Sequence, residues 1–156
     1  MNAIPTVQVD NARVIVNLLY SDIIERFPKL RFVSVESGLG WIPFLLEACE
    51  YQWDQMVPNE VRHHTMRPTE KFRSSIYACF WFEDKALPGA MDVIGDNLMW
   101  ETDFPHPTCQ YPGPQGGFST HPRDYVNRVM GKMDEKKVAK VLHQNAAKLY
   151  GFKQLV

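Results

Sequence analysis

The first part of the chain carries the hydrophobic spacing of an amphipathic helix. Between residues 11 and 27, apolar side chains recur three or four positions apart, and charged residues are available for the solvent side. Pro28 ends the pattern, because proline lacks a backbone donor and does not fit inside a helix. A helix is therefore predicted over 11–27, with its apolar side formed by Val14, Ile15, Leu18, Leu19, Ile23 and Phe27.

Three later segments are apolar in the manner of buried strands. They cover residues 31–35, 75–82 and 97–102, and the middle one shows no polar alternation. Further helices are predicted from about 41, over 87–93, over 123–130 and over 135–149, the first of them with Phe44, Leu45, Ala48 and Tyr51 inward. Asp134 is expected to cap the last helix and Gly151 to end it. The polar interval 55–73 shows no clear pattern.

Helices that alternate with uniformly apolar strands predict an α/β fold with a parallel sheet covered on both faces. In such folds, functional groups gather at the carboxyl ends of the strands. Each predicted strand runs into an acidic residue at that end: Glu36, Glu83 and Asp103. These are either site candidates or solvated loop residues. The solvated interpretation is favoured for Glu83, which is followed by two more charged residues.

Composition narrows the classes of function. The 156 residues include 17 basic and 18 acidic side chains, for a formal net charge of -1, with no basic run to neutralise a phosphate backbone. A nucleic-acid partner is therefore not expected. No apolar stretch is long enough to span a bilayer and the N-terminus lacks a secretion-signal pattern, so a cytoplasmic protein without a membrane partner is predicted. The three cysteines form no CxxC pair and fit reduced thiols.

The most informative segment for chemistry is 100–106, with the sequence Trp-Glu-Thr-Asp-Phe-Pro-His. Asp103 stands at the end of an apolar strand, and the imidazole of His106 follows three residues later. Such a pair suits metal binding and proton transfer, the two needs of metal-assisted hydrolysis or decarboxylation. Asp103 is equally consistent with a turn cap before Pro105. The pattern by itself leaves both interpretations open.

Segment 102–106 resembles the strand-eight signature of the amidohydrolase-related family that includes aminocarboxymuconate-semialdehyde decarboxylase and aromatic acid decarboxylases, where a Ser-Asp-Tyr-Pro-His-like sequence is typical. Segments 27–33, 38–43, 68–72 and 145–151 resemble other parts of that family in the same order. The resemblance implies a (β/α)₈ barrel of the TIM type, which needs about 250 residues. The chain would then form one partial barrel domain over 1–156, the C-terminal portion with about strands six to eight.

The same resemblance implies a site. Asp103 would be the metal ligand and proton shuttle, with zinc or manganese as the divalent ion. Glu36 stands where many relatives have a histidine, and it would act as a base or an outer ligand. His106 would contact the substrate. The loop 104–122 lies where such barrels frame their sites, so Tyr111 and Phe118 are candidate substrate contacts, and a plain surface loop is equally consistent with the pattern. The family's His-x-His pair and its strand-five histidine have no counterpart here, and His63 and His64 are adjacent, which is the wrong spacing for one strand face; both are expected at the surface.

Two functions follow as hypotheses. In the first, the chain is a shortened product or one half of a split enzyme: a metal-dependent hydrolase or decarboxylase for a small aromatic or carboxylic acid that needs the N-terminal barrel half for full activity. In the second, it is a non-catalytic α/β remnant that self-associates to bury its open strand edges. A homo-oligomer or a complementary half is the expected protein partner. A nucleotide-binding fold is disfavoured, because Gly38 and Gly40 lack the third glycine of that motif.

Overall fold

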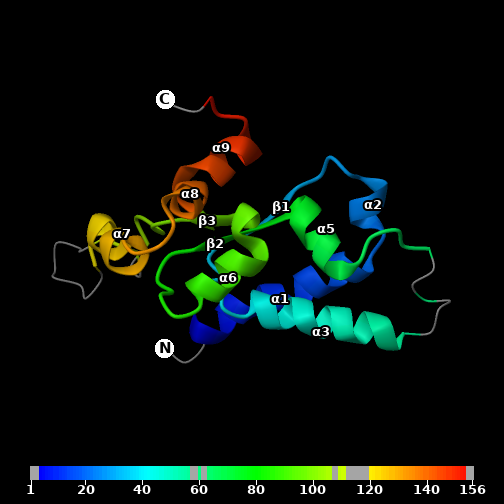
Figure 1. Ribbon diagram of the computed structural model, residues 1–156. Coiled ribbons are helices and arrows are strands. Elements are labelled where there is room, and N and C mark those ends of the chain that lie inside the picture. Colours follow the sequence, from blue (N-terminus) through cyan, green and yellow to red (C-terminus); the bar gives the residue numbers. More distant parts are fainter. Residues whose placement is uncertain (1–3, 57–59, 61–62, 107–108, 112–119, 154–156) are drawn as a thin grey trace.

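The computed structural model describes residues 4–56, 60, 63–106, 109–111 and 120–153, and it contains a small parallel sheet surrounded by helices (Figure 1). In chain order the elements are α1 (Ile4–Tyr20), α2 (Ile23–Arg26), β1 (Phe32–Ser34), α3 (Ile42–Gln55), α5 (Pro68–Ser75), β2 (Ile76–Phe80), α6 (Leu87–Ile94), a 3-10 turn (Gly95–Asn97), β3 (Leu98–Trp100), α7 (Pro122–Met130), α8 (Glu135–Ala139), a π-helical turn (Lys140–Gln144) and α9 (Asn145–Tyr150).

The three strands form one sheet in the order β1-β2-β3, with both pairs parallel. Val33 pairs with Tyr77, and Cys79 pairs with Met99. All five residues of β2 are buried, as a central strand covered on both faces requires. The predicted strands are confirmed, although each is shorter than the apolar run that predicted it. Their parallel order places all three carboxyl ends at one edge of the sheet.

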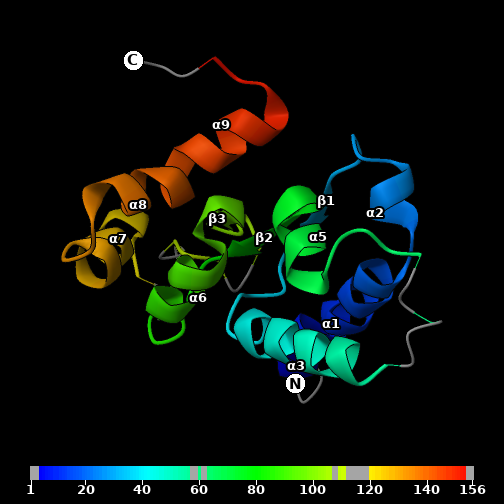
Figure 2. The same cartoon turned by 45° about the vertical axis from the view of Figure 1, so that its right-hand side comes forward.

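The two faces of the sheet are covered differently. Ile76, Ala78 and Phe80 belong to the large core shared with α1, α3, α6 and α7. Tyr77, Cys79 and Met99 point the other way and form a smaller cluster with residues of β1 and α9. In Figure 1, α1 and α3 run side by side below α5 and α6, whereas α9 lies above the sheet; Figure 2 shows the same separation after a turn.

The predicted first helix begins earlier and is broken. The α1 helix stops at Tyr20, where the Ser21 hydroxyl donates to Leu18 O over 2.9 Å and accepts from the Ile23 N–H over 3.3 Å. The break changes the helical register, so that α2 buries Ile24 rather than Ile23. The inward placement expected for Val14 and Phe27 is therefore wrong, since both are exposed. Ile15 and Leu19 are buried as predicted.

The α3 helix faces the core with a different side from the one predicted. Its buried residues are Ile42, Leu46 and Cys49, which follow each other at four- and three-residue spacing. Phe44 and Tyr51 point outward and are 73% and 64% exposed, so their expected inward placement is wrong. Apolar residues occur on more than one side of this helix, and packing against the rest of the fold determines which of them are buried.

The C-terminal helical region follows the prediction closely. Asp134 caps it by accepting the Lys137 N–H over 3.0 Å, and Gly151 ends it with a left-handed φ of 72°. The predicted single helix is interrupted by the π-helical turn before α9. At the start of α9, the buried Asn145 amide donates to Gly95 O over 2.8 Å and to Leu98 O over 2.7 Å, which fastens α9 to the beginning of β3.

Two further expectations concern the polar interval and the thiols. The interval 55–73, which gave no pattern, contains most of α5, whose Lys71 and Phe72 are buried. The three cysteines are buried and none is in a disulfide, as expected for reduced thiols.

Across the part of the chain that the structure describes, no helix has both the length and the apolar character needed to cross a membrane.

Candidate metal centre

The end of β1 and the end of β3 bring three potential metal ligands together. Glu36 follows β1 by two residues, Asp103 follows β3 by three, and His106 lies in the turn after Asp103. One ligand atom from each of the three side chains lies within 4.8 Å of the other two. The two residues expected to be catalytic, Glu36 and Asp103, thus lie at the same edge of the sheet together with His106.

Both carboxylate residues have an unusual backbone conformation. The φ angles of Glu36 and Asp103 are 52° and 59°, in the left-handed region that residues with a Cβ seldom occupy. For residues other than glycine this conformation costs roughly 1–2 kcal/mol. Such strain is concentrated at functional sites, where the surrounding structure holds it in place.

Asp103 and His106 form a close pair across one turn. Asp103 Oδ2 lies 3.0 Å from His106 Nδ1, and the backbone N–H of His106 donates to the backbone carbonyl of Asp103 over 2.8 Å. The Asp103 side chain is only 6% exposed, whereas that of His106 is 54% exposed. The turn is closed from the other side by the Gln110 N–H, which donates to Thr102 O over 2.8 Å. The carboxylate is thus sheltered while the imidazole faces outward.

Glu101 is a further acidic residue at this edge of the sheet, and it was not among the site residues predicted from the sequence. Its Oε1 accepts the Glu36 N–H over 3.1 Å. Burial raises the pKa of the Glu101 carboxyl, and the Asp103 and Glu36 carboxylates act in the same direction, against hydrogen bonds from the Glu36 N–H and the Cys79 thiol. Its position directly after an apolar strand, two residues before Asp103, was the signal that could have identified it.

The pKa of the Cys79 thiol is also perturbed at this edge. Burial, together with the neighbouring Glu101 carboxylate, raises this pKa to about 12. Cys79 therefore stays protonated at neutral pH. Such a thiol behaves as a small core side chain rather than as a reactive group.

Glu83, at the end of β2, has a structural role instead of the solvated position favoured by the sequence. Its Oε1 accepts the Leu39 N–H over 2.7 Å, and its backbone carbonyl accepts the Tyr125 hydroxyl over 2.5 Å. The other carboxylate oxygen, Oε2, is buried and has no hydrogen-bond partner among the described residues. Gly38, with φ 66°, leaves room for this carboxylate, because a Cβ there would come within 2.3 Å of Oε1. The solvated interpretation of Glu83 is therefore wrong.

The histidine pair of segment 63–64 is divided between surface and interior. His63 is exposed as expected, but the His64 side chain is only 3% exposed, so its surface assignment is wrong. His64 Nδ1 lies 3.0 Å from the Nζ of the fully buried Lys71, which also pairs with Glu25 Oε1 at 3.1 Å. Burial lowers the pKa of His64, and the Lys71 charge lowers it further.

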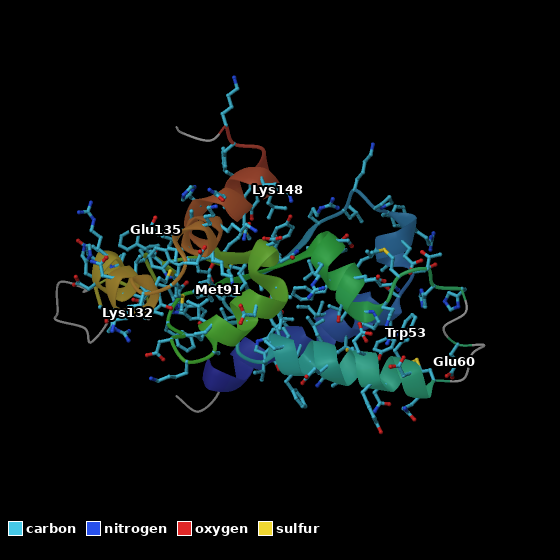
Figure 3. All side chains as sticks on the ribbon, in the orientation of Figure 1. Trp53, Glu60, Met91, Lys132, Glu135 and Lys148 are labelled. Atoms are coloured by element: carbon cyan, nitrogen blue, oxygen red, sulfur yellow. The ribbon has the colours of Figure 1, made fainter. Side chains whose placement is uncertain are left out.

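This buried cluster also contacts the α3 helix through Trp53. Lys71 Nζ is 5.8 Å from the centre of the Trp53 ring, near the C-terminal end of α3. Figure 3 shows Trp53 on the opposite side of the molecule from Lys132 and Glu135. The cluster joins α2, α3 and α5, and its contacts account for the burial of His64.

The loop residues expected to contact a substrate are only partly described. Tyr111 is 47% exposed, and its ring centre lies 5.8 Å from that of Phe104 and 6.0 Å from that of His121. Phe118 lies outside the described residues. His121 Nδ1 accepts the Arg123 N–H over 3.2 Å, which makes this histidine the cap of α7. Trp81 packs against Phe82, and Trp100 stacks on Tyr125.

The chemistry of the three grouped ligands fits a divalent ion. Two carboxylates and one imidazole are a donor set that zinc and manganese both accept. Zinc holds oxygen and nitrogen ligands at about 2.0–2.2 Å, so ligand atoms that lie within 4.8 Å of one another would draw closer together around one ion. Within the described residues this group supplies three protein ligands at most.

A protein-family model described as Amidohydrolase matches residues 6–152. Among solved structures, an amidohydrolase from Mycobacterium avium subsp. paratuberculosis K-10 has 22% sequence identity and a TM-score of 0.67. The 5-carboxyvanillate decarboxylase from Sphingomonas paucimobilis has 20% identity and a TM-score of 0.67. A dihydroxybenzoic acid decarboxylase from Polaromonas sp. JS666, solved with manganese and the inhibitor 2-nitroresorcinol, has 16% identity and a TM-score of 0.70.

These alignments cover 88%, 94% and 95% of this chain but only 32%, 41% and 42% of the respective solved chains. At such identities the likeness concerns the fold: the three-stranded parallel sheet and its helices match part of an amidohydrolase-like barrel. The chain thus spans less than half the length of these structures. No curated protein matches the sequence.

Proposed function

This chain belongs to the amidohydrolase family, and we propose that it forms the C-terminal portion of a metal-dependent hydrolase or decarboxylase that acts on a small carboxylic acid, aromatic acids included. Its three strands would correspond to about strands six to eight of the barrel. The observation that carries the proposal is the convergence of Glu36, Asp103 and His106 at the carboxyl edge of the sheet. That edge is where barrel enzymes hold their reacting groups.

In this proposal Asp103 is the central residue. Its sheltered carboxylate would hold zinc or manganese with one oxygen and take up a proton at the other. A bound divalent ion supplies polarisation of a water or of a substrate oxygen. Asp103 then needs only to accept and return a proton within hydrogen-bond reach, and its low exposure keeps bulk water from competing for it.

His106 would assist Asp103 from the solvent side. When Asp103 is ionised, its contact with Nδ1 makes that nitrogen the protonated one, which leaves the lone pair of the ring on Nε2. An imidazole in this state can accept a hydrogen bond or a proton from a substrate. Glu36 would serve as a base or an outer ligand, because an ionised glutamate accepts but does not donate hydrogen bonds.

These three residues form part of a site that other parts of a barrel would complete. A barrel of this type draws its site residues from several strands, and this chain contains three. We infer that an N-terminal barrel portion would supply the remaining ligands and most contacts to a small-molecule substrate. Tyr111 and Phe118 remain the proposed aromatic contacts on this chain, and their position in the segment 104–122 that follows Asp103 supports that role.

Manganese-induced line broadening in nuclear magnetic resonance spectra of the purified chain tests this proposal, because it detects even weak binding. Signals of residues 36, 103 and 106 should broaden selectively, and this effect should be lost in Asp103→Asn. Outer partners of metal ligands already change affinity about 10–100-fold, so a direct ligand should matter at least as much. Asp10→Asn, an exposed change on α1, is the control. Equal broadening in the wild type and Asp103→Asn would refute the assignment.

A second candidate function rests on the sheet itself. Among the described strands, β1 and β3 each pair on one side only. Open edges favour association with another chain. A non-catalytic, self-associating remnant would therefore form a stable metal-free dimer in sedimentation experiments and show no selective manganese effect, whereas the enzyme proposal expects that effect with or without dimerisation.

A further inference from the structure

Glu101 connects two strand ends that are not neighbours in the sheet. The β2 strand lies between β1 and β3, and neighbouring strands are about 4.8 Å apart. The ends of β1 and β3 are therefore separated by roughly 10 Å, too far for a direct backbone hydrogen bond. The Glu101 carboxylate bridges this gap by accepting the Glu36 N–H over 3.1 Å.

The backbone of Glu101 is fixed at the other end of this bridge. Its N–H donates to Phe80 O over 2.9 Å, which continues the pairing of β3 with β2 beyond Trp100. Glu101 lies two residues after Met99, so its side chain leaves the sheet on the face that carries Cys79. The side chain thus crosses the end of β2 next to the Cys79 thiol, which hydrogen-bonds to it.

The residue that Glu101 reaches needs such support. Glu36 has a left-handed φ of 52°, which is unfavourable for a residue with a Cβ. Asp103, two residues after Glu101, has a similar φ of 59°. One side chain therefore connects the strained turn that carries Glu36 with the strand end that carries Asp103.

From this geometry we propose that Glu101 is a positioning residue, which spans the end of β2 and holds the Glu36 turn at the distance from Asp103 and His106 that a shared metal ion requires. The inference rests on the proposed metal-dependent function. The length of the side chain at position 101 is essential to this role. Glutamine has the same reach and offers an amide oxygen as acceptor, whereas aspartate keeps the charge but is one methylene shorter.

Amide hydrogen exchange at Glu36, measured residue by residue by nuclear magnetic resonance, tests the bridge directly. We expect the Glu36 N–H to be protected in the wild type and in Glu101→Gln. It should exchange about tenfold faster in Glu101→Asp and Glu101→Leu, because a hydrogen bond to this acceptor is lost. Glu47→Gln, an exposed change on α3, is the matched control and should leave the Glu36 rate unchanged.

Manganese broadening in the same samples separates this inference from the proposed function. If Glu101 is a positioning residue, selective broadening at 36, 103 and 106 should persist in Glu101→Gln and weaken in Glu101→Asp. Manganese binding would then depend on the length of the side chain at position 101 rather than on its charge. A Glu36 amide that exchanges equally fast in all variants, or that is already unprotected in the wild type, would overturn the inference. A third outcome separates the two proposals. If protection of the Glu36 N–H depends on side-chain length at position 101 but manganese causes no selective broadening, the bridge is supported and the metal-dependent function is refuted.

Discussion

The Asp103 carboxylate and the His106 imidazole meet at 3.0 Å although one is nearly buried and the other is more than half exposed. The contact joins Oδ2 to Nδ1, the ring nitrogen nearer the backbone. A buried acceptor next to an exposed ring determines which ring nitrogen carries the proton, since an ionised carboxylate can only accept.

This relationship predicts the tautomer of His106. Nitrogen-15 spectra at neutral pH should show His106 protonated at Nδ1, and both tautomers should be populated in Asp103→Ala. His121 is an internal control with the opposite expectation, because its Nδ1 accepts the Arg123 N–H and must be unprotonated there. An Nε2-protonated His106 in the wild type would contradict the geometry.

The left-handed conformation of Glu36 predicts a conflict between stability and function. Glu36→Gly removes a strain of roughly 1–2 kcal/mol, partly offset by the flexibility of glycine in the unfolded chain, for a net gain of about 0.5–1 kcal/mol. The Glu101 bridge is kept, because it uses the backbone N–H. Urea unfolding should show the gain while manganese broadening at the site weakens. Glu47→Gly in α3 should instead lose about 1 kcal/mol.

The contact between Gly38 and Glu83 predicts a marked loss of stability on adding one methyl group. Gly38→Ala combines an unfavourable φ of 66° with a Cβ that would lie 2.3 Å from Glu83 Oε1, and we expect a loss of about 2–3 kcal/mol. Gly89→Ala is the matched control: a Cβ there meets nothing within 4 Å, and α6 should gain up to about 1 kcal/mol. Similar unfolding midpoints for the two variants would contradict this account.

Lys71 is fully buried, and its ammonium group is surrounded by Ser21 O at 2.9 Å, His64 Nδ1 at 3.0 Å and Glu25 Oε1 at 3.1 Å. Removal of one partner of a buried pair leaves the other charge uncompensated. Lys71→Met should therefore lower the free energy of unfolding by about 3 kcal/mol or more. Lys136→Met, at an exposed position of α8, should change it by less than about 0.5 kcal/mol.

Glu25 predicts how stability depends on pH. Burial acts to raise its pKa, but hydrogen bonds from Thr65 and the contact with Lys71 outweigh it and lower the pKa from 4.5 to about 2. The unfolded chain thus binds a proton before the folded chain does, so this contribution is complete above about pH 4.5 and is lost as the pH falls towards 2. The lowered pKa of His64 acts with the same sign at higher pH.

Chemical denaturation between pH 7 and pH 3 checks this expectation. The free energy of unfolding should fall on acidification in the wild type, and the fall below pH 4.5 should be smaller in Glu25→Gln. Glu70→Gln removes an exposed glutamate of α5 and offers the comparison for a carboxylate outside the buried cluster. An unchanged slope in Glu25→Gln would contradict the role given to Lys71 and Thr65.

The sequence by itself determined the α/β alternation, the three strands, the last helices with Asp134 and Gly151, and the selection of Glu36, Asp103 and His106. These features depend on local properties: uniform apolarity, capping chemistry, and acidic residues directly after strands. The family resemblance is confirmed by the match over residues 6–152. The roles of the site residues, Tyr111 and Phe118 included, stay predictions.

The tertiary structure alone decided which apolar residues became core, which polar ones became buried, and which acidic residue joined the site. Phe44 and Phe27 point outward, while Lys71 and His64 point inward, because packing against distant elements selects among helix faces that the local pattern leaves equivalent. The contacts of Glu101 with Glu36 and of Glu83 with Leu39 could not be predicted from local sequence, because each joins residues more than 40 positions apart. Such pairings depend on the order of strands in the sheet, which no local pattern in the sequence records.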